Sequence, residues 1–215
     1  PHNRTMVMIG ACMLWVGWFG FNAGSAVAAD SSASMAMLVT HISAAVGALT
    51  WMSIEWVKQG KATMIGIATG MVAGLATITP AAGSVGPAGA LLIGVMAGYI
   101  CFYATQAIKG YFYIDDSLDV FPVHGVGGML GIIMISFLGS PDGFLGTGAA
   151  GIAEGGALVQ LKAQLIGITV IAAWTGLATY LIIKAISVFT DIRVSEDVEA
   201  EGVDINEHNE QGYSF

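Results

Sequence analysis

The fold class follows first from one uncharged stretch of the chain, Ala62-Thr-Met-Ile-Gly-Ile-Ala-Thr-Gly-Met-Val-Ala-Gly-Leu-Ala-Thr-Ile-Thr-Pro80. Its length is close to the roughly 20 mainly apolar residues that a helix needs to cross the hydrocarbon core of a membrane. Small residues every four positions let membrane helices approach closely, so the stretch predicts a tightly packed spanning helix whose glycines have no direct ligand role. The glycines with this spacing, here and in two later stretches, are Gly66, Gly70 and Gly74, Gly94 and Gly98, and Gly127 and Gly131.

Five other stretches have the same apolar character, and none shows the sustained alternation that is typical of strands. A helix satisfies its backbone hydrogen bonds within its own segment, which favours it in lipid. The predicted spans are 5–28, 33–56, 62–80, 87–108, 118–138 and 158–189. The last is longer than necessary, so it tilts or extends beyond the bilayer. We expect an all-α membrane protein with a transmembrane bundle over residues 1–190. The polar, acidic tail over residues 191–215 is disordered, holds a short helix or docks on a partner.

Composition supports a membrane protein and excludes several classes of function. Of the 215 residues, 55% are hydrophobic and 10% are charged, and the mean hydropathy is +0.75. A soluble domain has roughly 25% charged residues, so a soluble enzyme is excluded. No nucleophile–base set, nucleotide loop or metal cluster is visible, and the few scattered Lys and Arg residues exclude nucleic-acid binding. Cys12 and Cys101 lie in apolar runs, where we expect core packing, so the sequence predicts no metal and no cofactor.

The positions of the charged residues predict the orientation of the bundle. The formal net charge is −8, but eight of the 15 acidic residues lie after Lys184, in the tail. Six alternating spans place every Lys and Arg except Lys162 on one side, which the positive-inside rule makes cytoplasmic. We therefore expect the N-terminal end, the turns at 57–61 and 109–117 and the tail to be cytoplasmic. Residues 80–87 and 139–157 should lie outside.

Two histidines, His41 and His124, lie within predicted spans. An ionisable side chain is costly there, so each is by default a hypothesis of function. A neutral imidazole donates one hydrogen bond and accepts another, so His124 can line a narrow pore or relay a proton. A histidine satisfied by packing is the other interpretation, and spacing alone does not separate the two.

Three further groups of residues each have an interpretation that involves no binding site. Asp116 or Asp119 can serve as the N-cap of the fifth span, and metal binding is a weaker alternative because the spacing of a calcium loop is absent. The first span ends in Gly17-Trp-Phe-Gly-Phe-Asn-Ala-Gly-Ser25, whose aromatic rings either bind a cation or form an interfacial belt. Glu55 and Lys58 are three residues apart and predict an ion pair on the helix surface, without chemistry.

Four motifs lie in order along the chain, and together they point to one family. They are Gly17-Trp-Phe-Gly-Phe-Asn-Ala-Gly-Ser25, Thr79-Pro-Ala-Ala-Gly-Ser-Val-Gly86, Asp115-Asp-Ser-Leu-Asp-Val-Phe-Pro-Val-His-Gly-Val-Gly-Gly128 and Glu201-Gly-Val-Asp204. At these positions the sequence resembles the ammonium transporter family (Amt/Mep/Rh), on its Amt/Mep branch. The third motif is highly specific. The resemblance is to the C-terminal half of such a transporter, so we expect this chain to be that half.

The resemblance implies a fold of eleven helices, built from two inverted five-helix repeats and a final long helix, with three subunits in each assembly. This chain then holds the second repeat and the final helix, and it lacks the first five helices with the first pore histidine. In that template Phe21 corresponds to a gate above the pore, Ser25 to the hydroxyl of the outer ammonium site, and His124 to the second pore histidine. His41 follows the aromatic motif, which gives it a structural or subunit-facing role.

The resemblance also implies a mechanism and partners. Ammonium is recruited at an external cation–π site and deprotonated, because burying a bare cation in an apolar pore costs far more than passing a neutral molecule. The proton travels separately along the histidines. Gly202 and Asp204 belong to a kink in the tail that couples neighbouring subunits of a homotrimer. A PII-type signalling protein docks on this cytoplasmic face in many bacterial members. The expected location is the plasma membrane, in contact with lipid.

Transport together with the missing half is the leading interpretation, and two others stay open. One is a sensor or regulatory module that binds ammonium without useful flux. The other is a truncated, non-conducting subunit that assembles with full-length copies.

Overall fold

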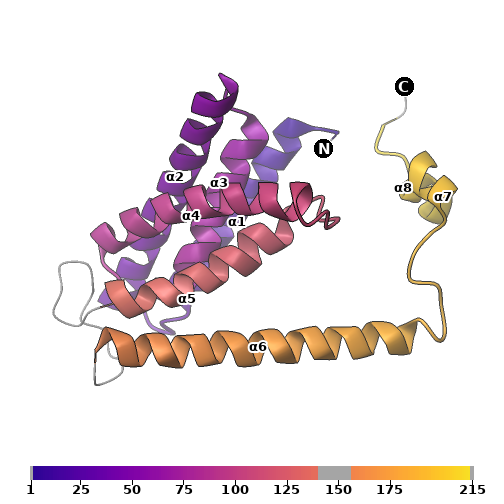
Figure 1. Ribbon diagram of the computed structural model, residues 1–215. Helices are drawn as coiled ribbons and strands as arrows, with labels where there is room; N and C mark the ends of the chain where they lie inside the picture. Colours follow the sequence, from indigo (N-terminus) through magenta and orange to yellow (C-terminus); the bar gives the residue numbers. More distant parts are fainter. Residues whose placement is uncertain (1, 140–155, 214–215) are drawn as a thin grey trace. The chain divides into compact units, whose positions relative to one another are not determined.

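The structure, a computed structural model, describes residues 2–139 and 156–213 as helices joined by turns (Figure 1). By their contacts the residues divide into two units, 1–168 and 169–215, and each is described by itself. The helices are α1 (Arg4–Gly24), α2 (Ser31–Gln59), α3 (Met64–Ile78), η1 (Thr79–Ala81), α4 (Pro87–Gly110), η2 (Phe121–Val126), α5 (Gly127–Leu138), α6 (Ala157–Ile186), α7 (Glu196–Glu201) and α8 (Val203–His208).

All six predicted spans are confirmed as helices long and apolar enough to cross a membrane, within the residues that the structure describes. The third span is α3 extended by the 3-10 helix η1, and the fifth is the π-helical turn η2 continued by α5. The ends of the spans differ from the prediction by a few residues, and at α2 capping groups set both ends. Asp30 caps α2 by accepting a hydrogen bond from the backbone N–H of Ala33 at 2.9 Å, and Gly60 ends that helix at φ 75°.

The glycines of α3 lie against α2, as the four-residue spacing predicts. A side chain at Gly70 would collide with Trp51 and with the carbonyl oxygen of Gly47, and one at Gly74 would collide with the backbone of Ser43. Gly98 of α4 lies against the same Gly47 carbonyl, whose oxygen would be 2.8 Å from a Cβ atom added at Gly98. The backbones of α2, α3 and α4 therefore approach closely at Gly47, which confirms the packing role predicted for the glycines.

The core of the first unit is built around α3, which contacts α1, α2, α4 and α5. Its Leu75 and Ile78 are fully buried, and Val39 of α2 and Ile93 of α4 pack in the same interior. The glycines at the start of α5 extend this packing, because a side chain at Gly131 would collide with the Thr77 carbonyl. A central helix enclosed on several sides holds the surrounding helices in fixed register.

The predicted ion pair between Glu55 and Lys58 is wrong. Glu55 is buried, and its carboxylate accepts hydrogen bonds from the backbone N–H of Thr63 at 2.7 Å and from the Thr63 hydroxyl at 3.0 Å. The indole N–H of Trp51 also donates to it, at 3.3 Å. The turn at Gly60 brings the first residues of α3 back over Glu55, so the carboxylate meets the positive end of α3. Helix spacing alone does not reveal this contact.

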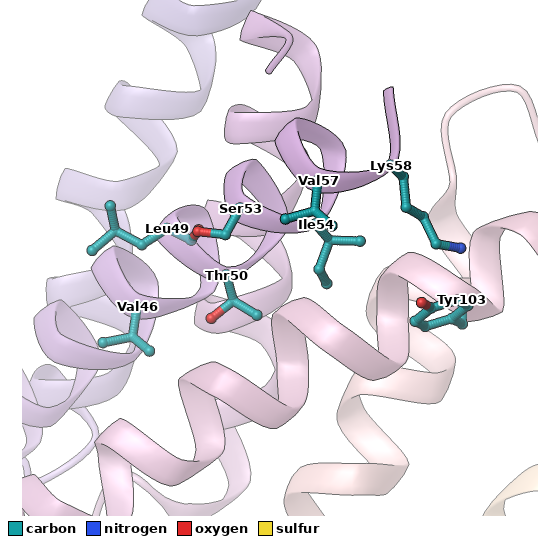
Figure 2. Close-up of a pocket in the computed structure, with 8 residues that line it drawn as sticks. All are labelled: Val46, Leu49, Thr50, Ser53, Ile54, Val57, Lys58 and Tyr103. Atoms are coloured by element: carbon teal, nitrogen blue, oxygen red, sulfur yellow. The ribbon is translucent and has the colours of Figure 1, made fainter. Parts of the chain in front are cut away.

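Lys58 instead lies over an aromatic ring of α4. Its ammonium nitrogen is 4.4 Å from the centre of the Tyr103 ring and 5.6 Å from that of Phe102, within the range of a cation–π contact. Figure 2 shows Lys58 reaching toward Tyr103 at one end of a groove between α2 and α4. The groove has a volume of about 440 Å³, and Val46 and Leu49 lie along it.

The second unit contains the end of α6 and the two short helices of the tail. The tail forms the short helices that were one of its predicted alternatives. Ser195 caps α7, and Arg193 forms an ion pair with Glu199 at 3.0 Å. Gly202 separates α7 from α8 at φ 119°, a left-handed value that favours glycine. The division between the units at residue 168 falls inside α6, so the predicted boundary at residue 190 stays a prediction.

Candidate functional site

Three aromatic side chains from two helices form a ring set, consisting of Trp18, Phe21 and His124. The Trp18 and Phe21 rings of α1 are 6.1 Å apart between centres and meet edge to face at 76°. The Trp18 and His124 rings are 6.4 Å apart and nearly parallel, at 14°. Trp18 thus links the predicted gate Phe21 to the predicted pore histidine.

The position of Phe21 follows from how α1 is anchored. The side-chain amide of Asn22 is buried and donates a hydrogen bond to the Thr40 hydroxyl of α2 at 2.9 Å. A buried polar pair of this kind fixes the rotation of α1 about its axis, because breaking it would leave buried polar groups unsatisfied. With Asn22 facing inward, Phe21 faces outward, and 63% of its surface is exposed.

His124 owes its position to the π-helical turn η2. Pro122 and Val123 are buried and hold the turn against the bundle, whereas the His124 side chain is exposed. π-helical turns inside helices are rare and occur frequently at functional sites. The wider turn breaks the regular 3.6-residue register, so a histidine placed by ordinary helical spacing would point elsewhere.

The two predicted capping aspartates have different positions in the structure. The Asp116 carboxylate accepts hydrogen bonds from the backbone N–H groups of Val120 and Phe121, at 2.9 and 2.8 Å. Asp119 has a φ of 56° and forms an ion pair with Lys109 of α4 at 2.7 Å. Asp116 therefore satisfies the free donors at the start of η2, and Asp119 ties the same segment to the end of α4.

Ser25 and Phe21 line the same hollow, which has a volume of about 370 Å³. The Ser25 hydroxyl donates to the Phe21 carbonyl at 2.6 Å, so its oxygen remains able to accept a hydrogen bond from a ligand. Thr79 and Gly83 also line the hollow. A second hollow, of about 620 Å³, runs along α1. Its lining consists of glycines and of apolar side chains, among them Met13, Trp18 and Phe21.

His41 lies against other rings of α1, Trp15 and Phe19. Its ring centre is 5.1 Å from that of Trp15 and 6.1 Å from that of Phe19. The imidazole side chain is exposed. These contacts fit a packing role or a subunit-facing role, and the role predicted for His41 remains a prediction.

Two residues of the site, Trp18 and Thr79, could not be identified as such from the sequence. Trp18 lies within the first aromatic motif, but the motif alone does not show which ring stacks on His124. Thr79 stands out only as part of a motif, and its hydroxyl accepts a hydrogen bond from the Trp18 indole N–H at 2.7 Å. The pattern of a threonine followed by proline at a helix end gives no sign of a partner on another helix.

The comparison with known proteins decides the family. A model of the Ammonium Transporter Family matches residues 1–213. The chain belongs to the ammonium transporter family. The Archaeoglobus fulgidus ammonium transporter Amt1 is 42% identical over 215 residues, which cover 100% of this chain and 53% of that protein. The ammonium transporter of Mycobacterium tuberculosis is 40% identical over 219 residues, which cover 100% of this chain and 46% of that protein.

Solved structures agree with this family membership. Saccharomyces cerevisiae Mep2 matches with a TM-score of 0.78 and 35% identity, over 88% of this chain and 45% of that one. A structure named Sensor Amt Protein matches with a TM-score of 0.87 and 26% identity, over 96% of this chain and 50% of that one. The chain is therefore a multi-pass membrane protein with the helical fold of the family, and it spans about half the length of the relatives it matches.

Proposed function

We propose that this chain supplies one wall of a conduction pathway for ammonium and ammonia, and that His124 lines it. The observation that carries the proposal is the ring set: Trp18 joins the exposed Phe21 to the exposed His124. The apolar hollow along α1 adjoins Trp18 and Phe21. The relatives are named ammonium transporters, which supports ammonium as the substrate of the complete pathway.

The outer end of the proposed pathway combines an aromatic ring with a hydroxyl. An ammonium ion over the Phe21 ring would gain a cation–π contact, which is strongest where water is excluded. The Ser25 oxygen, on the wall of the same hollow, would accept one of the ammonium hydrogen bonds. Together these groups would replace part of the hydration shell that the cation loses when it leaves bulk water.

Beyond Phe21 the lining becomes apolar, and this favours deprotonation. An ionised ammonium without partners is far more costly to bury than neutral ammonia, because its charge loses solvation. Neutral ammonia can donate to or accept from an imidazole, and His124 offers both kinds of nitrogen. We propose that the proton leaves the substrate before the apolar segment and passes separately along the histidines.

The proposed pathway needs a second wall. The face of α1 that carries Phe21 and Leu14 is exposed and apolar, and exposed apolar patches often mark sites of interaction. We propose that the remaining half of the transporter, with the first pore histidine, covers this face. We further propose a homotrimer in the plasma membrane with a cytoplasmic tail, in which the kink at Gly202 and Asp204 couples subunits or receives a PII-type protein.

One observation favours a second candidate function. The match to the Sensor Amt Protein, at a TM-score of 0.87, keeps open an ammonium sensor that binds the ion at Phe21 and Ser25 without sustained flux. The two functions predict different currents. A transporter gives a lasting ammonium-evoked charge movement, whereas a sensor gives at most a brief binding signal.

The test is an ammonium-evoked current on a solid-supported membrane. The chain would be reconstituted in liposomes alone, and also together with the N-terminal half of the Archaeoglobus fulgidus relative. We expect a lasting current from the pair and none from the chain alone. A lasting current from the chain alone would show that no second wall is needed. A correctly assembled pair with only a brief signal would favour the sensor.

A further inference from the structure

The indole of Trp18 is tied to the core through a threonine. Its N–H donates to the Thr79 hydroxyl oxygen at 2.7 Å. The same hydroxyl donates to the backbone carbonyl of Leu75 at 2.7 Å, and Leu75 is fully buried in α3. Each polar group in this chain of two hydrogen bonds has a partner, so the indole is held to a rigid helix instead of rotating freely.

We propose that Thr79 is a positioning residue, which sets the orientation of the Trp18 indole and through it the arrangement of Phe21 and His124. The proposal rests on the proposed function, in which these two side chains touch the substrate. Trp18 contacts Phe21 edge to face and lies nearly parallel to His124. A rotation of the indole would therefore move the surface against which both side chains rest.

A second indole on α1 differs from Trp18 in its hydrogen bonding. Trp15 lies one helical turn before Trp18, and its indole N–H is buried with no hydrogen-bond partner in the described part of the chain. Trp15 packs on His41, which is not a member of the ring set. Within the described residues, the hydrogen bond is therefore found on the indole that links Phe21 to His124 and not on that of Trp15.

Thr79 also occupies a place from which it can act on both hollows. It lies at the junction of α3 and η1, half-buried, and lines the hollow that contains Ser25 and Phe21. Through Trp18 it is connected to the apolar hollow along α1. A displacement of about 1 Å of the groups that act on a substrate can lower a rate by about a hundredfold. The orientation of a single indole can therefore change the rate of conduction.

The test compares Thr79→Val, which keeps the shape but removes the hydroxyl, with Thr79→Ser, which keeps the hydroxyl. Each variant of the full chain would be paired with the N-terminal half of the Archaeoglobus fulgidus relative. We expect Thr79→Val to lower the ammonium current about tenfold and to change the ratio of ammonium to methylammonium current. Thr79→Ser should restore both to near the wild-type values. Trp18→Phe, which removes the indole N–H, should reproduce the effect of Thr79→Val on the ammonium current. Trp15→Phe is its matched control and should not reproduce that effect.

An NMR measurement on the chain in nanodiscs separates the positioning role from the proposed function. The indole N–H resonance of Trp18, identified by its loss in Trp18→Phe, should move in Thr79→Val and stay in place in Thr79→Ser. An unmoved resonance in Thr79→Val, unchanged currents in that variant, or equal losses in both Thr79 variants would each overturn the positioning role. Absence of current from the wild-type pair would contradict the proposed function instead, while the NMR result would still decide whether Thr79 holds the indole.

Discussion

The indole of Trp18 lies nearly parallel to the imidazole of His124, with ring centres 6.4 Å apart and planes inclined by 14°. The two rings come from α1 and from the π-helical turn η2, which are far apart in the sequence. This contact joins the first aromatic motif to the aspartate–histidine motif. It gives a physical reason for the presence of both motifs in one chain, because each supplies a part of the same ring set.

Replacing Phe21 with Ala should weaken discrimination at the outer end of the pathway. Its ring is exposed beside the hollow that holds Ser25, and removal takes away the cation–π surface, which contributes about 0.5–2 kcal/mol. Currents evoked by ammonium and by potassium would be compared in the paired transporter. Phe19→Ala, in the same motif but against His41, is the control. Unchanged discrimination in Phe21→Ala would count against the gate role.

Replacing Glu55 with Ala should lower the free energy of unfolding by about 1–3 kcal/mol. The buried Trp51 indole and the donors of the exposed Thr63 would lose their carboxylate acceptor, and hydrogen bonds to a charged group contribute about this much. Thermal unfolding in detergent measures the change. Lys58→Met is the control, because Lys58 is exposed and contacts the Tyr103 ring rather than Glu55. Equal effects of the two substitutions would contradict the anchoring role of Glu55.

Replacing Gly70 with Ala should destabilise the contact between α2 and α3 by about 1–3 kcal/mol. A methyl group there would collide with Trp51 and the Gly47 carbonyl, so the helices would have to separate. Gly176→Ala is the matched control, since nothing lies within 4 Å of its added methyl group. The melting temperature of the purified chain in detergent distinguishes the two. A Gly70→Ala variant as stable as Gly176→Ala would refute the close packing.

Much of the fold could be predicted from the sequence. The length of the apolar stretches predicts the six spans, because a helix needs about 20 apolar residues to cross a membrane. The spacing of the glycines predicts the close contacts at Gly70 and Gly74. The contact of Glu55 could not be predicted in this way. Helix geometry pairs Glu55 with Lys58, but the turn at Gly60 places Thr63 over the carboxylate. Such contacts depend on where a turn returns the chain, and hydropathy carries no information about that.

The candidate site was predictable only in part. The motifs indicate Phe21, Ser25 and His124, and the structure brings Phe21 and Ser25 to one hollow and links Phe21 to His124 through Trp18. The link itself could not be predicted, because it depends on the π-helical turn η2 and on a hydrogen bond between two helices. The loop predicted to lie on the external side, residues 139–157, falls almost entirely outside the described residues.

Whether His124 lines the ammonium pathway is decided by one comparison of currents. His124→Ala would be compared with His41→Ala in the chain paired with the N-terminal half, after assembly has been checked by size-exclusion chromatography. We predict that His124→Ala lowers the ammonium current by about tenfold or more, or abolishes its discrimination against potassium, because a general acid–base group contributes at least this much. His41→Ala should behave like the wild type. A correctly assembled His124→Ala pair that conducts and discriminates like the wild type would show that His124 does not line the pathway.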